Sequence, residues 1–314
     1  MTETPPPEVA RLLAARSEAR AGRAWADADE LRDRIRSLGW EPIDTPHGST
    51  ARPALPETAA GPTGYARPED MESILDEPAT LDASLVVQVD DHPDDLVRFA
   101  DGLRRHPPAL AWELLAVLNG VADGFDADTA LAGLPAIVLP TAARLGWADA
   151  ANLGLRRVRG RAAVVLDTSL EPTGPFLEPL VAAVATEDVG IAGPWGVSSA
   201  DGRQFAEAPP GEVDAVQAYC LAIRREALQR VRGFDRRFHF YRNADLDLSF
   251  AVRDAGWRAL ATEPLPLTRH QHRGWASLPE AERDRLSKRN FYRFLDHWGN
   301  RPELLLANRA EGAQ

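Results

Sequence analysis

The chain has 314 residues, 44% of them hydrophobic and 26% charged, with a formal net charge of −11. That length suffices for one large domain with a sizeable core and a small further module. The negative charge argues against general binding of DNA, RNA or anionic lipid, which requires a cationic face. No apolar run reaches the roughly 18 residues of a membrane span, and no signal-peptide pattern opens the sequence, so we expect a cytoplasmic protein. The single cysteine, Cys220, lies in an apolar run, which predicts a buried side chain without a disulfide.

The first 50 residues are typical of a small helical module. Apolar side chains recur at three- and four-residue spacing over 8–40, where Gly22 interrupts the pattern and Gly39 ends it. This pattern predicts a helical hairpin within 1–50. The stretch 51–80 opens with a run of proline, glycine and alanine that has no period, which predicts a linker.

From residue 81 onward, short apolar runs alternate with helical patterns. The helical patterns fall near 94–105, 145–158 and 175–185. Four apolar runs indicate buried strands, at 85–89, 114–118, 136–139 and 162–166. This alternation predicts a Rossmann-like α/β domain over 81–275, with a mostly parallel mixed sheet flanked by helices. A charged helical pattern near 280–296 predicts a C-terminal helical extension over 276–314.

Several familiar phosphate and nucleophile motifs are absent from the sequence. It contains no G-x-x-x-x-G-K-[ST] loop, no G-x-G-x-x-G after the first strand and no G-x-S-x-G elbow. Acidic residues follow the predicted strands instead, Asp90 and Asp91 after the first and Asp167 at the end of the fourth. Carboxylates at this edge of a sheet suit a ribose hydroxyl or a hard cation such as Mg²⁺ or Mn²⁺. Because Asp-x-Ser also nucleates turns, a capping role for Asp167 is an equal alternative.

Asp245 and Asp247 lie two residues apart at a predicted helix start. One interpretation is that a carboxylate here caps the helix and favours its positive end. The other is that one of the two projects into a cleft as a general base, with its pKa raised by the neighbouring acid.

His270 and His272 also lie two residues apart, in a stretch expected to be extended. Their side chains then point to opposite sides, so at most one of them faces a given site. That histidine suits a cation already held by carboxylates, and exposed polar histidines in a loop are an equal alternative.

Taken in order, these segments resemble glycosyltransferase family 2, which has the A-type nucleotide-sugar transferase fold. Leu166-Asp-Thr-Ser stands at the position of the family's Asp-x-Asp motif. Ala222-Ile-Arg-Arg-Glu-Ala-Leu with Gly233-Phe-Asp is similar to the segment before its Glu-Asp motif, and Asp245-Leu-Asp-Leu-Ser matches the end of that motif. The resemblance covers about residues 83–300.

The resemblance implies inverting transfer from a nucleotide diphosphate sugar to a hydroxyl acceptor, assisted by Mg²⁺ or Mn²⁺. Asp245 would remove the acceptor proton as the catalytic base. The implied contacts to the nucleotide sugar are Asp90, Asp91, Asn119, Asn152, Asp167 and Ser169. The implied metal ligands are Asp167, Ser169, His270 and His272. The implied acceptor-side residues are Arg224, Tyr241 and Asp247.

Three acidic positions of the family are altered in this sequence. Ser169 replaces the second Asp of the Asp-x-Asp motif, Leu118 an Asp after the second strand, and Ala244 the Glu of the Glu-Asp motif. A neutral hydroxyl is a weaker ligand than a carboxylate, which predicts weak or absent metal binding. The alternative function is therefore a catalytically degenerate binding protein on the same fold.

Residues 8–50 have a separate resemblance, to the C-terminal tail of cysteinyl-tRNA synthetase. It is carried by Ala14-Ala-Arg-Ser-Glu-Ala-Arg and Trp25-Ala-Asp-Ala-Asp-Glu-Leu-Arg-Asp-Arg-Ile. Because that tail belongs to a tRNA-recognising region, the resemblance implies an adaptor for RNA or a partner. The segment mixes arginine with at least as many acids, which favours packing on the catalytic domain or on a partner over RNA binding.

Overall fold

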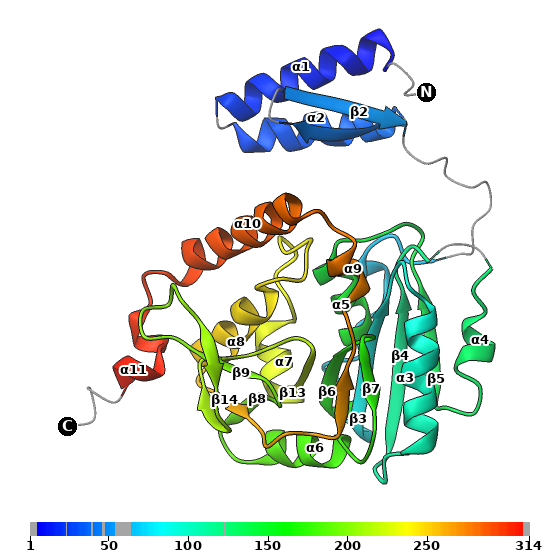
Figure 1. Cartoon of the computed structure of the whole chain (residues 1–314), viewed down its shortest axis with the longest axis vertical. Helices are drawn as coiled ribbons and strands as arrows, with labels where there is room; N and C mark the ends of the chain where they lie inside the picture. Colours follow the sequence, from blue (N-terminus) through cyan, green and yellow to red (C-terminus); the bar gives the residue numbers. More distant parts are fainter. Residues whose placement is uncertain are drawn as a thin grey trace. The chain divides into compact units, whose positions relative to one another are not determined.

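The computed structural model describes residues 5–22, 24–38, 40–45, 48–53, 64–121 and 124–309 (Figure 1). The chain divides into two compact units, 1–61 and 62–314. Among the described residues, no helix combines the length and the apolar character needed to cross a membrane.

The first unit combines two helices with a β-hairpin. Its elements are α1 (Pro7–Ala21), α2 (Trp25–Ser37), β1 (Trp40–Thr45) and β2 (Gly48–Pro53). The helices are those that the apolar spacing predicts, and Val9, Leu13 and Ile35 are buried between them. The antiparallel pair β1–β2 was not predicted, because the apolar residues of β1 do not alternate along the strand.

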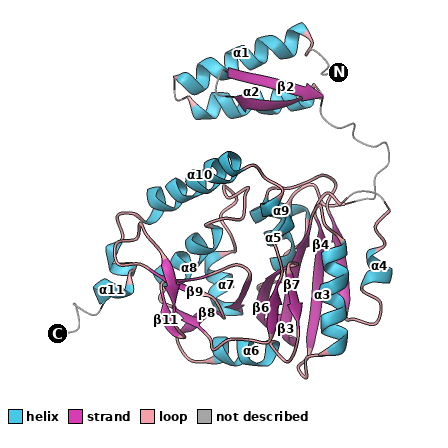
Figure 2. Cartoon of the chain, in the orientation of Figure 1, coloured by secondary structure: helices cyan, strands magenta, loops and turns pink. Residues whose placement is uncertain are grey.

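The second unit is built around one eight-stranded sheet, which Figure 2 shows as a central layer surrounded by helices. Its order is β11-β14-β8-β13-β6-β3-β4-β5. In chain order these strands are β3 (Leu81–Val89), β4 (Trp112–Leu118), β5 (Ala136–Pro140), β6 (Gly160–Asp167), β8 (Val189–Gly193), β11 (Gly211–Val213), β13 (Cys220–Arg224) and β14 (Arg258–Ala261). Only β11 and β13 run against the others, which confirms the prediction of a mostly parallel mixed sheet.

Helices cover both faces of this sheet, because its central strands are apolar on both sides. One face is covered by α3 (Asp94–Arg105) and α6 (Leu177–Ala185). The other is covered by α5 (Trp147–Leu155), α7 (Arg225–Val231) and α8 (Ala244–Asp254). Within β3, Leu85 joins Phe99 of α3 in one core, whereas the next residue, Val86, joins Leu153 of α5 in the other.

The order of the strands creates a crevice at one edge of the sheet. After β3 the chain adds β4 and β5 on one side of it, and then returns to place β6 on its other side. The connections that follow β3 and β6 therefore leave in opposite directions. In open α/β sheets, ligands bind at the carboxyl ends of the strands beside such a reversal.

Residues 64–80 belong to the second unit and are not part of a linker. They contain the short 3₁₀ helix η1 (Pro68–Asp70), and Met71 and Leu75 are buried in the main core. The guanidinium of Arg225 donates to the carbonyls of Ile74 and Glu77. The predicted linker was too long, because its proline-rich opening masked the apolar anchors that follow. Its first residues lie in β2, and 54–63 lie outside the described residues.

The C-terminal extension also packs on the second unit. It contains α10 (Glu280–Trp298), η2 (Pro302–Leu304) and α11 (Leu306–Arg309). Phe294 and Trp298 of α10 are buried against Phe250 of α8, with ring centroids 4.9 and 6.1 Å away. The remaining elements are the strands β7 (Leu170–Pro172), β9 (Gly196–Ser198), β10 (Ala206–Ala208), β12 (Ala215–Val216) and β15 (Leu267–Arg269), with the short helices α4 (Ala127–Ala130) and α9 (Arg273–Ala276).

Candidate active site

Two adjoining pockets open at the carboxyl ends of β3 and β6. The first, called here the strand-end pocket, is lined by Gln88, Asp90 and Asp91 at the end of β3 and by Asp167 and Ser169 at the end of β6. The second, called the helix-side pocket, is lined by Gln217, Tyr219, Arg242 and Asp245. Both pockets share five lining residues, namely Trp147, Asp167, Ala218, Tyr241 and His272. The two therefore form one continuous site in which Asp167, Asp245 and His272 meet.

The β7–β15 pair brings Asp167 and His272 together. These strands are antiparallel, and the pairing continues as a hydrogen bond from the His270 amide to the Ser169 carbonyl, at 2.9 Å. Asp167 Oδ2 then lies 3.2 Å from His272 Nε2. Burial by itself would raise the pKa of Asp167, but the hydrogen bonds from His272 and Ser169 outweigh it and hold the pKa below its ordinary value.

Asp167 has the capping role and faces the site as well. Its Oδ1 accepts the backbone N–H of Ser169 at 2.8 Å, which forms the expected Asp-x-Ser turn. The turn leaves Oδ2 directed at His272. The two interpretations of this residue are therefore compatible in the structure.

The ring of His272 is fixed on three sides. Its Nδ1 accepts the backbone N–H of Trp275 at 3.0 Å, and its face stacks on Tyr241 with centroids 4.7 Å apart. Because Nδ1 is an acceptor, the proton of the neutral ring lies on Nε2, where it is donated to Asp167. This arrangement makes His272 a partner that orients Asp167.

His270 lies outside both pockets. Its Nε2 is 2.8 Å from Glu171 Oε2, and the same carboxylate group binds Arg105. The two histidines thus face different sides, as their spacing predicts. His270 therefore does not contribute to either pocket.

Ser169 supplies a buried hydroxyl to the strand-end pocket. Its side chain is 2% exposed, and its Oγ has no hydrogen-bond partner among the described residues. A buried hydroxyl without a partner is unfavourable unless a ligand completes it. Asp167 and Ser169 together therefore offer hard oxygen ligands of the type that Mg²⁺ and Mn²⁺ prefer.

The residues that follow β3 form the opposite wall of the strand-end pocket. Asp91 makes a two-pronged ion pair with Arg144, at 2.5 and 2.9 Å. Asp90 accepts Gln88 Nε2 at 3.0 Å, and burial raises the pKa of Asp90 despite the nearby Arg144. The Oε1 of Gln88 is buried without a partner among the described residues, so this amide can still accept a hydrogen bond.

Asp245 is the acid that lines the helix-side pocket. It lies in the first turn of α8, and its Oδ2 accepts the backbone N–H of Ala218 at 3.0 Å. Burial raises the pKa of Asp245 above its ordinary value, against the lowering effect of these backbone donors and of Arg242. A fixed carboxylate of raised basicity in a pocket suits proton removal.

Asn119 and Asn152 both hold backbone loops and line neither pocket. Asn119 Oδ1 accepts the Leu145 amide at 2.7 Å. Asn152 binds both the N–H and the C=O of Phe234, each at 2.8 Å. Gly233 precedes this clamp with a φ of 100°, and a side chain there would meet Asn152. The side-chain amides of Asn119 and Asn152 thus have backbone partners within the protein, and a structural role explains both residues without a bound nucleotide.

Arg224 lies at the far edge of the sheet from Asp167. Because β13 is antiparallel to β6, Cys220 is opposite Leu166 whereas Arg224 is opposite Ala162. Its guanidinium donates to the carbonyls of Val189 and Thr186. The sequence of β13 does not reveal that the strand is antiparallel to β6. The prediction of Arg224 as an acceptor-side residue therefore concerned a residue that lies at the opposite edge of the sheet.

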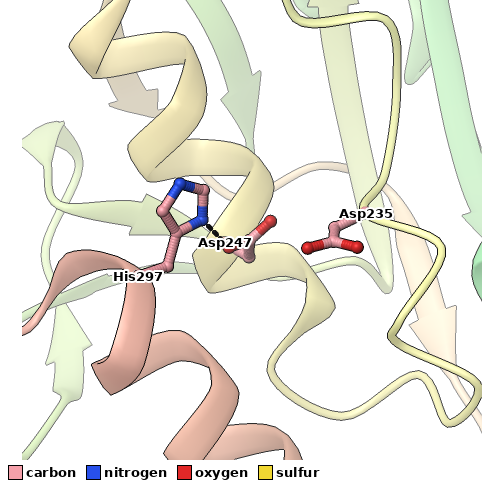
Figure 3. Close-up of side chains that lie close together, drawn as sticks. All are labelled: Asp235, Asp247 and His297. Carbon is pink, nitrogen blue, oxygen red and sulfur yellow. Dashed lines mark hydrogen bonds and ion pairs between the residues drawn. The ribbon is translucent and has the colours of Figure 1, made fainter. Parts of the chain in front are cut away.

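Asp247 is directed away from Asp245, as two residues on one helix are. It accepts Trp298 Nε1 at 2.8 Å. It also lies 3.3 Å from His297 Nδ1, as Figure 3 shows. Asp235 completes a group whose ligand atoms all lie within 4.8 Å, a spacing compatible with a cation. Arg237 already pairs with Asp235 at 2.6 Å, however, and no member of the group lines either pocket. Asp247 is thus left out of the acceptor side.

Several lining residues were not among the predicted site residues, and Gln88, Arg242 and Arg273 are the polar ones of most interest. Gln88 is the penultimate residue of β3, and its polar side chain in an otherwise apolar strand was a usable signal. Arg242 adjoins the predicted helix start, and Arg273 follows His272 directly. Arg273 pairs with both Asp94 and Asp95, at 2.7 and 3.0 Å, and so ties α9 to α3. Those pairings are non-local and have no sequence signature.

Comparison with models of known protein families shows which family the chain belongs to. The model of glycosyl transferase family 2 matches residues 84–250, more than half of the chain. The chain belongs to glycosyl transferase family 2. The model of the cysteinyl-tRNA ligase anticodon binding domain also matches this family 2 chain, at residues 3–40. A search of curated protein sequences finds no match.

Several solved structures are similar to this family 2 chain. A crystal structure of GalNAc-T7 with UDP, GalNAc and Mn²⁺ is 15% identical with a TM-score of 0.56, covering 73% of this chain and 50% of that one. A mannosyltransferase from Pyrobaculum calidifontis in complex with GDP-Man and Mn²⁺ is 18% identical with a TM-score of 0.45, covering 62% and 57%. S. aureus TarS is 12% identical with a TM-score of 0.49, covering 68% and 43%. The chain thus spans about half the length of these structures, and the likeness concerns the fold.

Proposed function

We propose that this protein is an inverting glycosyltransferase that moves a sugar from a nucleotide diphosphate sugar to a hydroxyl group. The observation that carries the proposal is the meeting of Asp167, Asp245 and His272 in one site at the carboxyl ends of the central strands. Membership of glycosyl transferase family 2 supports the same reaction.

On the donor side, Asp167 and Ser169 would hold a divalent ion. The partnerless buried hydroxyl of Ser169 and the fixed carboxylate of Asp167 fit such an ion, while His272 orients Asp167. When bound, the ion would stabilise the charge of the leaving diphosphate. The Mn²⁺ and UDP in the GalNAc-T7 structure support testing this pair first.

On the acceptor side, Asp245 would act as the general base. The acceptor oxygen forms a bond to the anomeric carbon while the bond from that carbon to the diphosphate oxygen breaks. The acceptor proton passes to the Asp245 carboxylate, and the electron pair leaves with the diphosphate. Attack from the face opposite the leaving group inverts the anomeric configuration. Asp167 lines both pockets whereas Asp245 lines the helix-side pocket, which supports this division of roles.

A donor screen tests the proposal. Thermal stabilisation by UDP, GDP, ADP and TDP, each with and without Mn²⁺, identifies the nucleotide. We expect one of them to bind and Asp167→Asn to weaken it by roughly 10-fold or more, as loss of a charged ligand does. Glu187→Gln removes an exposed carboxylate that lines neither pocket, and serves as the control. If none of the four nucleotides stabilises the wild type, with or without Mn²⁺, the proposal is overturned.

The second candidate is a binding protein without turnover. Ser169 in the Asp-x-Asp position and the buried Ala244 in the Glu-Asp motif favour it, because each removes an acid. It predicts nucleotide binding without hydrolysis or transfer. Slow release of free sugar from the bound donor, lost in Asp245→Asn, excludes this candidate.

A further inference from the structure

Two exposed arginines flank the helix-side pocket without an acidic partner. Arg242 lines that pocket, and Arg269 lies over Tyr219, which lines it too. Neither guanidinium makes a hydrogen bond or an ion pair with any described residue. Two other arginines around the site are paired, since Arg144 binds Asp91 and Arg273 binds Asp94. An unpaired guanidinium beside a pocket is available to a ligand.

Both arginines are held by aromatic rings. The Arg242 guanidinium lies 5.5 Å from the ring centroid of Trp275. That of Arg269 lies 5.5 Å from Trp195 and 4.9 Å from Tyr219. Stacking on a ring fixes the plane of a guanidinium while its N–H groups stay free at the edge. Such an edge matches the two oxygens of a carboxylate or phosphate.

We infer that the acceptor of the proposed transfer is a small hydroxylated molecule with an anionic oxygen group, a phosphate or a carboxylate, which Arg242 binds with support from Arg269. The inference rests on the proposed function. Arg242 directly precedes Asn243, the N-cap of α8, and the first turn of this helix carries Asp245, so a bound anion lies on the same side of the pocket as the proposed base. The anion sets the orientation of the acceptor, and its hydroxyl reaches Asp245.

The charges around the pocket explain why arginine is needed there. Asp167 and Asp245 both line it, and their carboxylates repel an anionic ligand. Arg242 and Arg269 are exposed at the rim, whereas Asp245 is partly buried and bound by the Ala218 amide. An anion at the rim therefore meets the cations first, and its neutral hydroxyl end enters toward the carboxylates.

Binding of matched probes tests the inference. The probes are glycerol, glycerate, glycerol 3-phosphate and inorganic phosphate, measured by calorimetry with the full chain. The donor pocket is filled beforehand with the nucleoside diphosphate found in the screen, so that the probes cannot occupy its phosphate site. We expect the anionic probes to bind and glycerol not to bind. The order of glycerate and glycerol 3-phosphate shows which oxyanion the site prefers.

Arginine variants give the decisive comparison. Arg242→Gln should weaken the anionic probes by roughly 10- to 100-fold, the effect of losing a charged hydrogen-bonding pair. Arg242→Lys keeps the charge but lacks the planar guanidinium, so its affinity for the anionic probes should lie between those of the wild type and Arg242→Gln. Arg230→Gln is the control, since Arg230 is an exposed arginine of α7 that lines neither pocket.

The outcomes separate the inference from the proposed function. Equal binding of glycerol and glycerol 3-phosphate overturns the inference, as does anion binding that Arg242→Gln leaves unchanged. If Arg242→Gln weakens the nucleoside diphosphate as much as the probes, Arg242 serves the donor and the inference fails. If no nucleotide binds the wild type, the proposed function itself fails, whatever the probes do.

Discussion

Asp167 and His272 face each other across 3.2 Å, with the imidazole proton directed at the carboxylate. In this geometry His272 positions the acid that would hold the metal ion. His272→Ala should therefore weaken Mn²⁺-dependent nucleotide binding only a few-fold, less than Asp167→Asn, because an outer partner contributes less than a ligand. Titration of each variant with nucleotide and Mn²⁺ measures the difference. Equal losses in both variants would show instead that His272 is itself a ligand.

A substitution at Ser169 should increase the affinity of the site for metal ions. Ser169→Asp adds a carboxylate beside Asp167, which should tighten Mn²⁺ on the order of ten-fold, since ligand charge tunes affinity. Without metal the two acids repel each other, so this variant should unfold at lower temperature than the wild type.

Ser169→Ala is the matched comparison for that experiment. Because Ser169 Oγ has no hydrogen-bond partner among the described residues, its removal should change the unfolding free energy by less than about 0.5 kcal/mol. Metal binding by Ser169→Ala that equals the wild type would remove the hydroxyl from the proposed ligands.

Asp245 should combine a catalytic role with a cost in stability. Asp245→Asn keeps an oxygen that can accept the Ala218 amide but cannot take a proton, so transfer should fall by roughly 10²- to 10⁴-fold. Nucleotide affinity should stay within about two-fold, because Asp245 is assigned to the acceptor side. A variant that keeps its turnover would contradict the assignment.

The difference in stability between Asp245→Asn and the wild type should depend on pH. The pKa of Asp245 is raised in the folded state above its ordinary 3.8, so between these two values the folded chain binds more protons than the unfolded chain. The contribution of Asp245 to the free energy of unfolding therefore falls as pH rises through that window, and then levels off above the folded-state pKa. The stability of Asp245→Asn relative to the wild type should be greater at about pH 7.5 than at about pH 4. Thermal unfolding of both proteins at the two pH values measures this, and a constant difference would argue against the raised pKa.

Asn152 should matter for stability and little for binding. Asn152→Ala leaves the N–H and the C=O of Phe234 unpaired in a buried place, which predicts a loss of about 2–4 kcal/mol in the free energy of unfolding. Urea denaturation measures the loss, with Asn308→Ala as a control at an exposed asparagine. If Asn152→Ala were as stable as the wild type but bound no nucleotide, the amide would belong to the donor site after all.

The fold was largely predictable because its central strands are continuous apolar runs. That pattern located β3, β4, β5 and β6 and, with parallel strands, placed Asp90, Asp91 and Asp167 at one edge. Other elements were missed, since the four residues of β14 are too few to show a period and the apolar residues of β1 do not alternate along the strand.

Site residues were predictable where the backbone sets their direction and not where a tertiary partner does. Asp167 ends a buried strand, so its place follows from the strand itself. Asp247 is drawn toward Trp298, and Arg224 toward the carbonyls that follow α6. Arg242 has no carboxylate partner among the described residues, and this can be recognised only in the folded structure.

The β7–β15 pair has a consequence for how the site can change over time. It joins the chain just after Asp167 to the chain just before His272, and so closes everything in between into one large loop of sequence. That enclosed segment carries β13, α8 and Arg242. Insertions or exchanges within it need not alter the spacing of Asp167 and His272. If Asp167 serves the donor and Asp245 the acceptor as proposed, changes confined to this segment alter the acceptor side and leave the donor side as it is.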